Sequence, residues 1–263
     1  MSKNLLLNVS LSVVIIAKNE EKNIVDCLES VSGWADEIIV VDDESTDRTA
    51  KIAEEMGARV LRRKMDIEGR HRNWAYSQAK NDWVLSLDAD EIVTEELKKE
   101  ISEVLKDNPS YVGFSIPLRN YIGNYWVRYG GWYPAGKVRL FRKTKIRYEE
   151  AKVHPRVFID GRCGHLTKDI VHKGYPDIAH FLDSLNRQSS WEAEKWVDTS
   201  RQMSLFRIIW RSIDRFFRRY IRKRGYKDGL YGFVVAFFDS LYQVISYLKY
   251  KELLRTAKDN LTD

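Results

Sequence analysis

The sequence predicts an α/β protein with a doubly wound, mostly parallel sheet, a smaller region that follows it in the chain, and a C-terminal helical tail. Three observations lead to this class. Short runs of Val, Ile and Leu alternate with helical patterns as far as Lys106, and such alternation is typical of βαβ units. A region rich in aromatic residues and glycine interrupts the alternation, and the C-terminal part combines helical apolar spacing with many arginines.

The apolar runs of the first half are continuous rather than alternating, as in strands that are buried on both faces of a sheet. They lie at 11–17, 37–41, 59–62 and 83–87. Helices are expected between them, at 19–33, from Thr46 or Asp47 to Met56, and at 69–79. Thr94 is placed to cap a fourth helix, which is rich in Glu and Lys and ends at Lys106.

The second half follows a different pattern. Strands are expected at 112–117, 138–142 and 156–159, and a polar helix at 178–201. The stretch 125–136 (YWVRYGGWYPAG) is full of aromatic residues and glycine. We therefore expect an α/β half at 1–110, a second half of the same domain at 111–200, and a basic helical tail at 201–263.

Composition excludes several classes of protein. With 14 Gly and 5 Pro in 263 residues, the chain is neither collagen-like nor of low complexity. Two cysteines are too few for a disulfide scaffold or for a zinc site made of thiolates. No small-residue cleavage site follows a continuous apolar core near the N-terminus, so we expect no signal peptide.

Positive charge is concentrated in the tail. Residues 201–227 carry a net charge of +9, whereas the whole chain carries +6. Within 205–221 the apolar residues follow helical spacing beside a stripe of arginines, which is typical of a helix in the headgroup region of an anionic membrane. The alternative is a helix packed on the protein, with solvated arginines. The stretch 229–248 is long enough for a membrane span but contains Asp239 and Gln243, and Asp239 with two glycines favours a monotopic or helix-packed hairpin.

Two acidic pairs come directly after predicted strands. They are Asp42-Asp43 and the pair Asp88 and Asp90. Ligands of open α/β sheets bind beyond such strand ends. An Asp in the first pair can accept a hydrogen bond from a nucleobase or a ribose. The second pair can share a hard divalent cation that bridges a diphosphate. Taken alone, each pair is also compatible with a solvated turn or an acidic helix N-terminus.

An arginine-containing segment, Gly69-Arg70-His71-Arg72-Asn73, lies between the two acidic pairs and opens a predicted helix. Arginine binds phosphate oxygens in a bidentate fashion, so this segment is a candidate phosphate site. A base or ribose site, a phosphate site and a metal site therefore follow one another in chain order.

In this ordered combination the sequence resembles glycosyltransferase family 2, whose members have the Rossmann-like GT-A fold. The matching segments are VVIIAKNEE at 13–21, EIIVVDDESTDRT at 37–49, GRHRNWA at 69–75 and DWVLSLDADE at 82–91. Later segments resemble the WaaE-type branch, which is named for bacterial lipopolysaccharide core glycosyltransferases. These are VRLFRK at 138–143, KVHPRVFIDG at 152–161, VHKGY at 171–175 and YKDGLYGF at 226–233.

The resemblance implies an inverting hexosyltransferase that uses a nucleotide-sugar, usually a UDP-sugar, together with Mg²⁺ or Mn²⁺. Its nucleotide-sugar site would consist of Ala17, Asn19, Glu20, Asp43, Arg72 and Asp88. Its metal ligands would be Asp88 and Asp90, with His172 from later in the chain as a third ligand. A purely structural role is the alternative for His172.

An inverting transfer also needs a carboxylate that takes the proton of the acceptor hydroxyl. Many relatives have a Glu after Val-His in the later motif, where this sequence has Pro155. The nearest carboxylates are Glu149 and Glu150, of which we favour Glu150, and a surface salt bridge is the alternative role for both. Glu91 is a weaker alternative base.

Aromatic side chains surround Gly130 and Gly131; they are Trp126, Tyr129, Trp132 and Tyr133. Aromatic faces stack on sugar rings and glycines permit movement, so this segment suits an acceptor platform or a lid. An aromatic core beneath a long loop explains it equally well.

The sequence therefore predicts a cytoplasmic enzyme that is peripherally attached to the inner membrane through 204–248. The expected partners are a UDP-sugar, a glycolipid or lipopolysaccharide core acceptor, and an anionic membrane surface, and no nucleic acid. The alternative is a membrane-surface or nucleic-acid-binding protein that uses the basic helix without catalysis. That alternative leaves the two acidic pairs unexplained.

Overall fold

The computed structural model describes residues 10–106, 109–150 and 156–259. The chain divides into two compact units, one made of Met1–Arg119 and Ala135–Gly174, the other of Asn120–Pro134 and Tyr175–Asp263. This division differs from the boundaries expected after residues 110 and 200. Segment 120–134 and the helix that begins at 178 group with the C-terminal helices rather than with the sheet.

The first unit is built on a seven-stranded sheet in the order β12-β6-β9-β4-β1-β2-β3. Its strands are β1 (Leu11–Ala17), β2 (Glu37–Asp42), β3 (Arg59–Arg62), β4 (Trp83–Asp88), β6 (Gly113–Ile116), β9 (Lys137–Arg142) and β12 (Cys163–His165). Strands β1 to β4 are mutually parallel, whereas β9 runs antiparallel to both of its neighbours. The predicted α/β class with a mostly parallel sheet is therefore confirmed.

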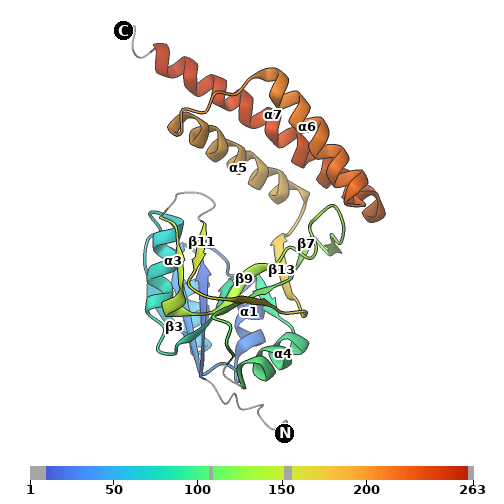
Figure 1. Cartoon of the computed structure of the whole chain (residues 1–263). Helices are drawn as coiled ribbons and strands as arrows, with labels where there is room; N and C mark the ends of the chain where they lie inside the picture. Colours follow the sequence, from blue (N-terminus) through green and yellow to red (C-terminus); the bar gives the residue numbers. More distant parts are fainter. Residues whose placement is uncertain (1–9, 107–108, 151–155, 260–263) are drawn as a thin grey trace. The chain divides into compact units, whose positions relative to one another are not determined.

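Helices cover both faces of this sheet (Figure 1). They are α1 (Ile24–Val31), α2 (Thr49–Glu55), α3 (Glu68–Ser77) and α4 (Glu95–Lys106). Strand β1 explains the arrangement, because alternate side chains of a strand point to opposite faces. Val13 and Ile15 pack in the same core as α1 and α4, whereas Val14 packs with Ala75 of α3. Such double-sided burial is what the continuous apolar runs predicted.

Smaller elements complete the first unit. Strands β10 (Ile146–Tyr148) and β11 (Val157–Ile159) form an antiparallel pair, and the 3₁₀ helix η1 (Lys143–Lys145) precedes them. Strand β5 (Glu91–Val93) pairs antiparallel with the first half of β13 (Ile170–Tyr175). Thr94 caps α4 as predicted, since its hydroxyl oxygen accepts the N–H of Leu97 at 3.2 Å.

Strand register decides where the polar loops meet. Ala17 at the end of β1 lies opposite Asp42 of β2, and Ile16 lies opposite Asp88 of β4. Because these three strands are parallel and adjacent, the loops that follow them emerge together at one edge of the sheet. The acidic pairs that the sequence separates by more than forty residues are thus brought to the same edge.

The second unit is mainly helical. It contains α5 (Ile178–Asp198), α6 (Leu205–Phe217), the π-helical turn η2 (Arg218–Arg222), the 3₁₀ helix η3 (Gly225–Asp228) and α7 (Gly229–Asp259). Strand β7 (Leu118–Ile122) enters this unit and is followed by the short β8 (Tyr125–Trp126). Both α5 and α6 pack along α7 (Figure 1). Trp196 of α5 and Tyr247 and Tyr250 of α7 belong to one buried cluster.

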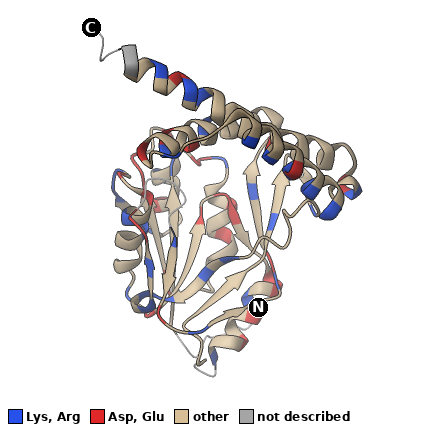
Figure 2. Cartoon of the chain, turned by 45° about the horizontal axis from the view of Figure 1, so that its top comes forward, with Lys and Arg blue, Asp and Glu red and all other residues tan. Residues whose placement is uncertain are grey.

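The basic helix predicted at 205–221 is present as α6 and η2, and α7 runs further than the apolar stretch 229–248. Figure 2 shows Lys and Arg gathered where α6 passes through η2 and η3 into α7. Asp239 of α7 pairs with Arg219 and, at 3.4 Å, with Arg215. The helix over 225–257 is long and apolar enough to cross a membrane, judged by length and composition alone. Asp239, the charged residue of the apolar stretch 229–248, is neutralised by these contacts within the unit.

Candidate functional site

A pocket of about 290 Å³ opens at the edge of the sheet where β1, β2 and β4 end. Six of the residues predicted for the nucleotide-sugar and metal sites line it: Ala17, Glu20, Asp43, Asp88, Asp90 and His172. They come from segments spread over 156 residues of the chain, from 17 to 172. Parallel pairing of β1 with β2 and β4, together with the pairing of β5 with β13, thus brings Asp43, Asp88, Asp90 and His172 to one site, which spacing alone did not establish.

Asn19 supports this pocket from outside its lining. Its backbone has φ +55°, in the left-handed region that Asn tolerates better than most residues. The side-chain oxygen of Asn19 accepts the N–H of Thr46 at 2.8 Å, and its own N–H donates to the hydroxyl of Ser45 at 2.9 Å. Asn19 therefore ties the loop after β1 to the loop after β2.

The two aspartates at the end of β2, Asp42 and Asp43, have different environments. Asp42 is buried and accepts the N–H of Ser45 at 3.1 Å, so it stabilises the turn. Asp43 faces the pocket, where it pairs with Lys18 at 2.8 Å and accepts the N–H of Met65 at 2.7 Å. The carboxylate of Asp43 is therefore held in one orientation at the pocket wall.

Asp88 lies at the centre of a buried charge cluster. Arg72 of α3 donates to one of its carboxylate oxygens at 3.0 Å, and Arg139 of β9 donates to the other at 2.6 Å. Arg139 also bonds the fully buried Glu91. Glu91 in turn accepts the backbone N–H of Asp88 at 3.0 Å. We call Arg72, Asp88, Glu91 and Arg139 the buried charge cluster.

The charges in the buried cluster shift its protonation equilibria. Burial opposes ionisation of Asp88, but Arg139 and Arg72 outweigh it and hold the pKa of that carboxyl well below its usual range. Burial raises the pKa of Glu91 against the opposing charge of Arg139. Across the pocket, burial and the neighbouring Asp90 raise the pKa of Glu20. Asp88 is therefore the carboxylate whose negative charge is most strongly fixed.

Sequence reasoning missed the role of Arg139. It lies in the segment VRLFRK, which was noted for its resemblance but given no function. Its side chain is only 3% exposed. The available signal was an arginine inside an apolar strand, between Val138 and Leu140, since a charge in such a position needs a buried partner.

Asp90 and His172 form the other side of the pocket. Pairing of β5 with β13 places His172 opposite Glu91, and the ring nitrogen Nε2 of His172 lies 3.3 Å from Asp90. Burial lowers the pKa of His172, but the contact with Asp90 outweighs it, so that the pKa is raised overall. The imidazole predicted as a late metal ligand therefore does lie beside the second aspartate.

The donor set has the chemistry that Mg²⁺ or Mn²⁺ requires, because carboxylates and an imidazole face one small pocket. Within the described ranges, no three His, Cys, Asp or Glu side chains are arranged together as a ready-made metal site. Both oxygens of Asp88 are bonded to arginines, as given above. A cation here would need Asp90 and Asp88 together with oxygens from a bound diphosphate.

A second pocket of about 310 Å³ lies beside the same cluster. Three cationic residues line it, Arg72, Lys137 and Arg139, together with Glu68 and Tyr148. Burial lowers the pKa of Lys137, as does the nearby charge of Arg139. Arg72 and Arg139 thus line one pocket while holding Asp88, which lines the other. Such a concentration of cations suits a polyanionic group.

The two candidate bases lie outside both pocket linings. Glu150 pairs with Arg70 at 3.0 Å, and Glu149 accepts the N–H of Arg156 at 3.2 Å. Their side chains are 54% and 40% exposed. Pro155 lies outside the described residues. Glu91, the weaker alternative, is fully buried and pairs with Arg139 in the charge cluster. These contacts are those of a residue that stabilises the fold.

The aromatic segment belongs to the second unit, and its members have different surroundings. Trp132 packs against Tyr175 and Phe181 in a buried cluster. Trp126 and Tyr129 instead line a separate pocket of that unit. The segment therefore combines the two roles that the sequence left open, an aromatic core and an accessible aromatic surface.

Comparison with known proteins agrees with this geometry. The family model described as "Glycosyl transferase family 2" matches residues 12–163. The chain is 30% identical to an uncharacterized glycosyltransferase of Rickettsia typhi, over 92% of this chain and 87% of that protein. It is 26% identical to the lipopolysaccharide core biosynthesis glycosyltransferase LpsC of Rhizobium meliloti, over 96% of each.

Among solved structures, S. aureus TarS 1-349 matches 95% of this chain and 92% of that chain, with 15% identity and a TM-score of 0.46. The fold and the position of the pocket define an α/β protein with a ligand site beyond the carboxyl ends of its parallel strands. The chain belongs to glycosyltransferase family 2.

Replacing Arg139 tests the importance of the buried charge cluster for stability. Arg139→Met leaves Asp88 and Glu91 without their shared partner, so we expect the free energy of unfolding to fall by about 3–5 kcal/mol. Urea-induced unfolding measures it. Arg147→Met is the control, because Arg147 is exposed on β10, and it should change stability by no more than about 0.5 kcal/mol. Equal losses in the two variants would contradict the assignment.

Proposed function

We propose that the protein is a metal-dependent, inverting hexosyltransferase that uses a UDP-sugar as donor. The observation that carries the proposal is the convergence of Ala17, Glu20, Asp43, Asp88 and Asp90 on one pocket at the carboxyl edge of the sheet. Such an edge is where open α/β sheets bind nucleotides. Membership of glycosyltransferase family 2 supports the same reading.

The donor would be divided between the two neighbouring pockets. The nucleoside would lie against Ala17 and Asp43, where a fixed carboxylate can accept hydrogen bonds from a base or ribose. The diphosphate would lie toward Arg72 and Arg139, whose guanidinium groups present paired donors to phosphate oxygens. The two parts of the donor would then meet at Asp88, which lines the first pocket and pairs with the arginines of the second.

Asp88, Asp90 and His172 would hold Mg²⁺ or Mn²⁺ in this scheme. When bound, such a cation neutralises charge on the diphosphate that leaves. A diphosphate in the second pocket would lie beside Arg72 and Arg139, which would stabilise the charge that develops on it as it leaves. A glucosyl-3-phosphoglycerate synthase of Mycobacterium tuberculosis, solved with Mn²⁺ and UDP, is a structural neighbour, with 19% identity and a TM-score of 0.46.

In the transfer itself, an acceptor hydroxyl oxygen forms a bond to the anomeric carbon as the bond from that carbon to the diphosphate oxygen breaks. The hydroxyl proton passes to a carboxylate. We propose Glu150, with Glu149 as the alternative. Glu150 lies just after β10, where its carboxylate pairs with Arg70 at 3.0 Å.

The acceptor that we propose is a lipopolysaccharide core or another membrane-linked glycan. The similarity to LpsC along nearly the whole of both chains supports this choice. We also propose that the enzyme works in the cytoplasm, attached peripherally to the inner membrane. The acceptor and the helical unit would then meet at the same surface.

Helix α6 supports the attachment. Ile208 is its buried residue, whereas Phe206 and Trp210 are 82% and 65% exposed. Exposed arginines, including Arg207 and Arg218, stand beside this apolar face. Exposed apolar side chains flanked by cations fit an anionic lipid surface, because the acyl boundary takes the former and the phosphates attract the latter.

Binding of UDP tests the proposed site. Calorimetric titration with UDP should show binding that depends on Mn²⁺ and that is lost in Asp90→Asn, because this change removes a pocket carboxylate outside the buried charge cluster. Asp160→Asn is the matched control, since Asp160 is exposed and pairs only with Lys145 in the described contacts. Unchanged metal-dependent binding in Asp90→Asn would contradict the metal assignment. Absence of UDP binding by the unaltered protein would refute the donor class.

The base is tested by kinetics. Glu150→Gln keeps the shape of the side chain but cannot take a proton, so kcat should fall by about 10²–10⁴-fold while the affinity for UDP stays unchanged. Glu149→Gln is the control and should retain most of the activity. The opposite pattern would transfer the role to Glu149.

Attachment to membranes is tested by flotation with vesicles that contain phosphatidylglycerol. The double variant Phe206→Ser, Trp210→Ser should bind at least about tenfold more weakly, because each lost side chain removes apolar surface from the interface. Trp191→Ser on α5, where Trp191 is 44% exposed, is the control. If the double variant binds vesicles as strongly as the control and the unaltered protein do, α6 is not the attachment face.

A further inference from the structure

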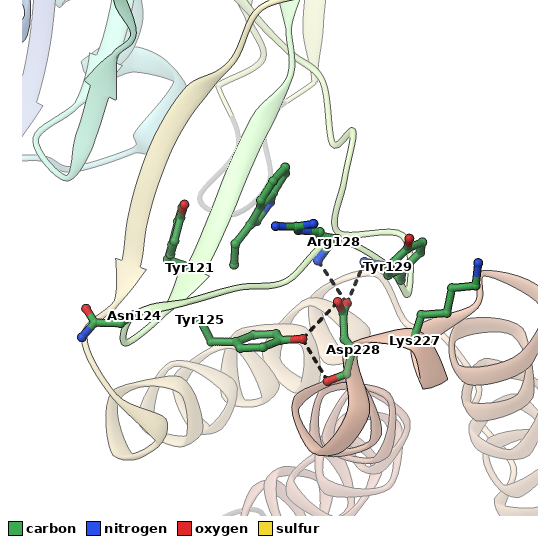
Figure 3. A pocket seen from close by; sticks show the side chains of 8 residues that line it. Tyr121, Asn124, Tyr125, Arg128, Tyr129, Lys227 and Asp228 are labelled. Carbon is green, nitrogen blue, oxygen red and sulfur yellow. Dashed lines mark hydrogen bonds between the residues drawn. The ribbon is translucent and has the colours of Figure 1, made fainter.

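The second unit contains a pocket of about 700 Å³ that the proposed donor chemistry does not use. Its walls come from the segment 121–129 and from η3, all within that unit (Figure 3). Aromatic rings and two cations line it. A volume of this order holds a ligand of several rings, and convergent polar groups in such a pocket fix orientation.

Asp228 fixes the shape of this pocket. Its side chain is only 4% exposed. One carboxylate oxygen accepts the backbone N–H groups of Arg128 at 3.0 Å and of Tyr129 at 2.7 Å. The hydroxyl of Tyr125 donates to the backbone oxygen of Asp228 at 3.1 Å. The dashed lines of Figure 3 mark these bonds, which join the aromatic segment to the end of η3.

Backbone contacts next to the pocket reinforce this join. The N–H of Gly130 donates to the carbonyl of Lys223 at 3.0 Å, and Arg219 donates to the carbonyl of Gly130 at 2.9 Å. Gly130 has φ +67°, a conformation that glycine adopts without strain. The glycine-rich segment is therefore held in place, and a preformed pocket binds its ligand at a lower entropic cost than a mobile loop.

The two cations of the pocket are available to a ligand. The guanidinium of Arg128 lies 4.3 Å from the ring centre of Trp126, and the ammonium of Lys227 lies 5.4 Å from that of Tyr129. In the described part of the chain, neither cation has a carboxylate within ion-pair distance. The charge of Asp228 is taken up by backbone N–H groups, as given above. Both cations are exposed, so an anion can approach them.

The aromatic walls suit a sugar ring. Tyr121 and Trp126 are half-buried and line the pocket. The C–H groups of a sugar pack on aromatic faces, while its hydroxyls need polar partners, and Tyr and Trp offer both an apolar ring and a polar atom. A neutral sugar would use the rings alone, but it would leave Arg128 and Lys227 without a counter-charge.

We propose that this pocket binds an anionic saccharide, a sugar that carries a phosphate or carboxylate group, through the rings of Tyr121 and Trp126 and the charges of Arg128 and Lys227. The inference rests on the proposed function, in which this saccharide belongs to the acceptor glycan. It defines the acceptor by its charge, which neither the family nor the donor site specifies.

The test uses the full chain and mannose 6-phosphate as the probe, with ligand-observed NMR as the readout. Mannose 6-phosphate should bind, and both mannose and inorganic phosphate should bind at least about tenfold more weakly, because each offers only half of the contacts. Arg128→Gln and Lys227→Gln should weaken binding of the probe about tenfold each. These changes leave the backbone N–H groups that Asp228 accepts in place, so the fold is retained.

Arg187→Gln is the matched control, because Arg187 is exposed on α5 and does not line the pocket. Binding that is unaffected by Arg128→Gln and Lys227→Gln would overturn the proposal. So would equal binding of mannose and mannose 6-phosphate, or of inorganic phosphate and mannose 6-phosphate.

Titration of UDP with the same variants separates this inference from the proposed function. Intact UDP binding together with no binding of the probe would refute only the saccharide pocket. Failure of the unaltered chain to bind UDP would instead refute the donor site. Displacement of mannose 6-phosphate by UDP at one shared site would overturn the proposal as well.

Discussion

The ion pair between Arg139 and Asp88 is the interaction on which the sheet-edge site depends. Arg139 also holds Glu91, so one guanidinium joins strands β4, β5 and β9. Burying three charges costs several kcal/mol per ion unless each finds its partners. Here the geometry supplies them, with Arg72 completing the set around Asp88. Arg139 and Arg72 hold the pKa of Asp88 well below its usual range, so its carboxylate is favoured at the end of β4, where the parallel strands open.

This arrangement gives the arginines two partners at different stages of the proposed reaction. In the structure they neutralise Asp88, and in the proposed complex a diphosphate would lie within reach of the same guanidinium groups. A cation held by Asp88 and Asp90 would then take over part of the charge that the arginines balance now. Binding of the donor would thus replace the ionic contacts of the free site with other ionic contacts. No unpaired charge would be left in the low-dielectric interior.

The strands and the acidic pairs were predictable because the sequence determines them locally. Continuous apolar runs marked β1, β2 and β4, and parallel pairing brings their following loops to one edge. The partner of Asp88 was not predictable in this way, because Arg139 is 51 residues away and reaches it only through the antiparallel pairing of β9 with β4. The same holds for the segment 120–134, which Asp228 binds from about a hundred residues away.

A crystal structure of the protein with UDP and Mn²⁺, analysed by the anomalous scattering of manganese, would show whether donor and metal bind together at the sheet edge. One strong manganese peak is expected beside Asp88 and Asp90, with the uracil toward Asp43 and the diphosphate toward Arg72 and Arg139. A peak elsewhere, or UDP bound away from the ends of β1, β2 and β4, would contradict this placement.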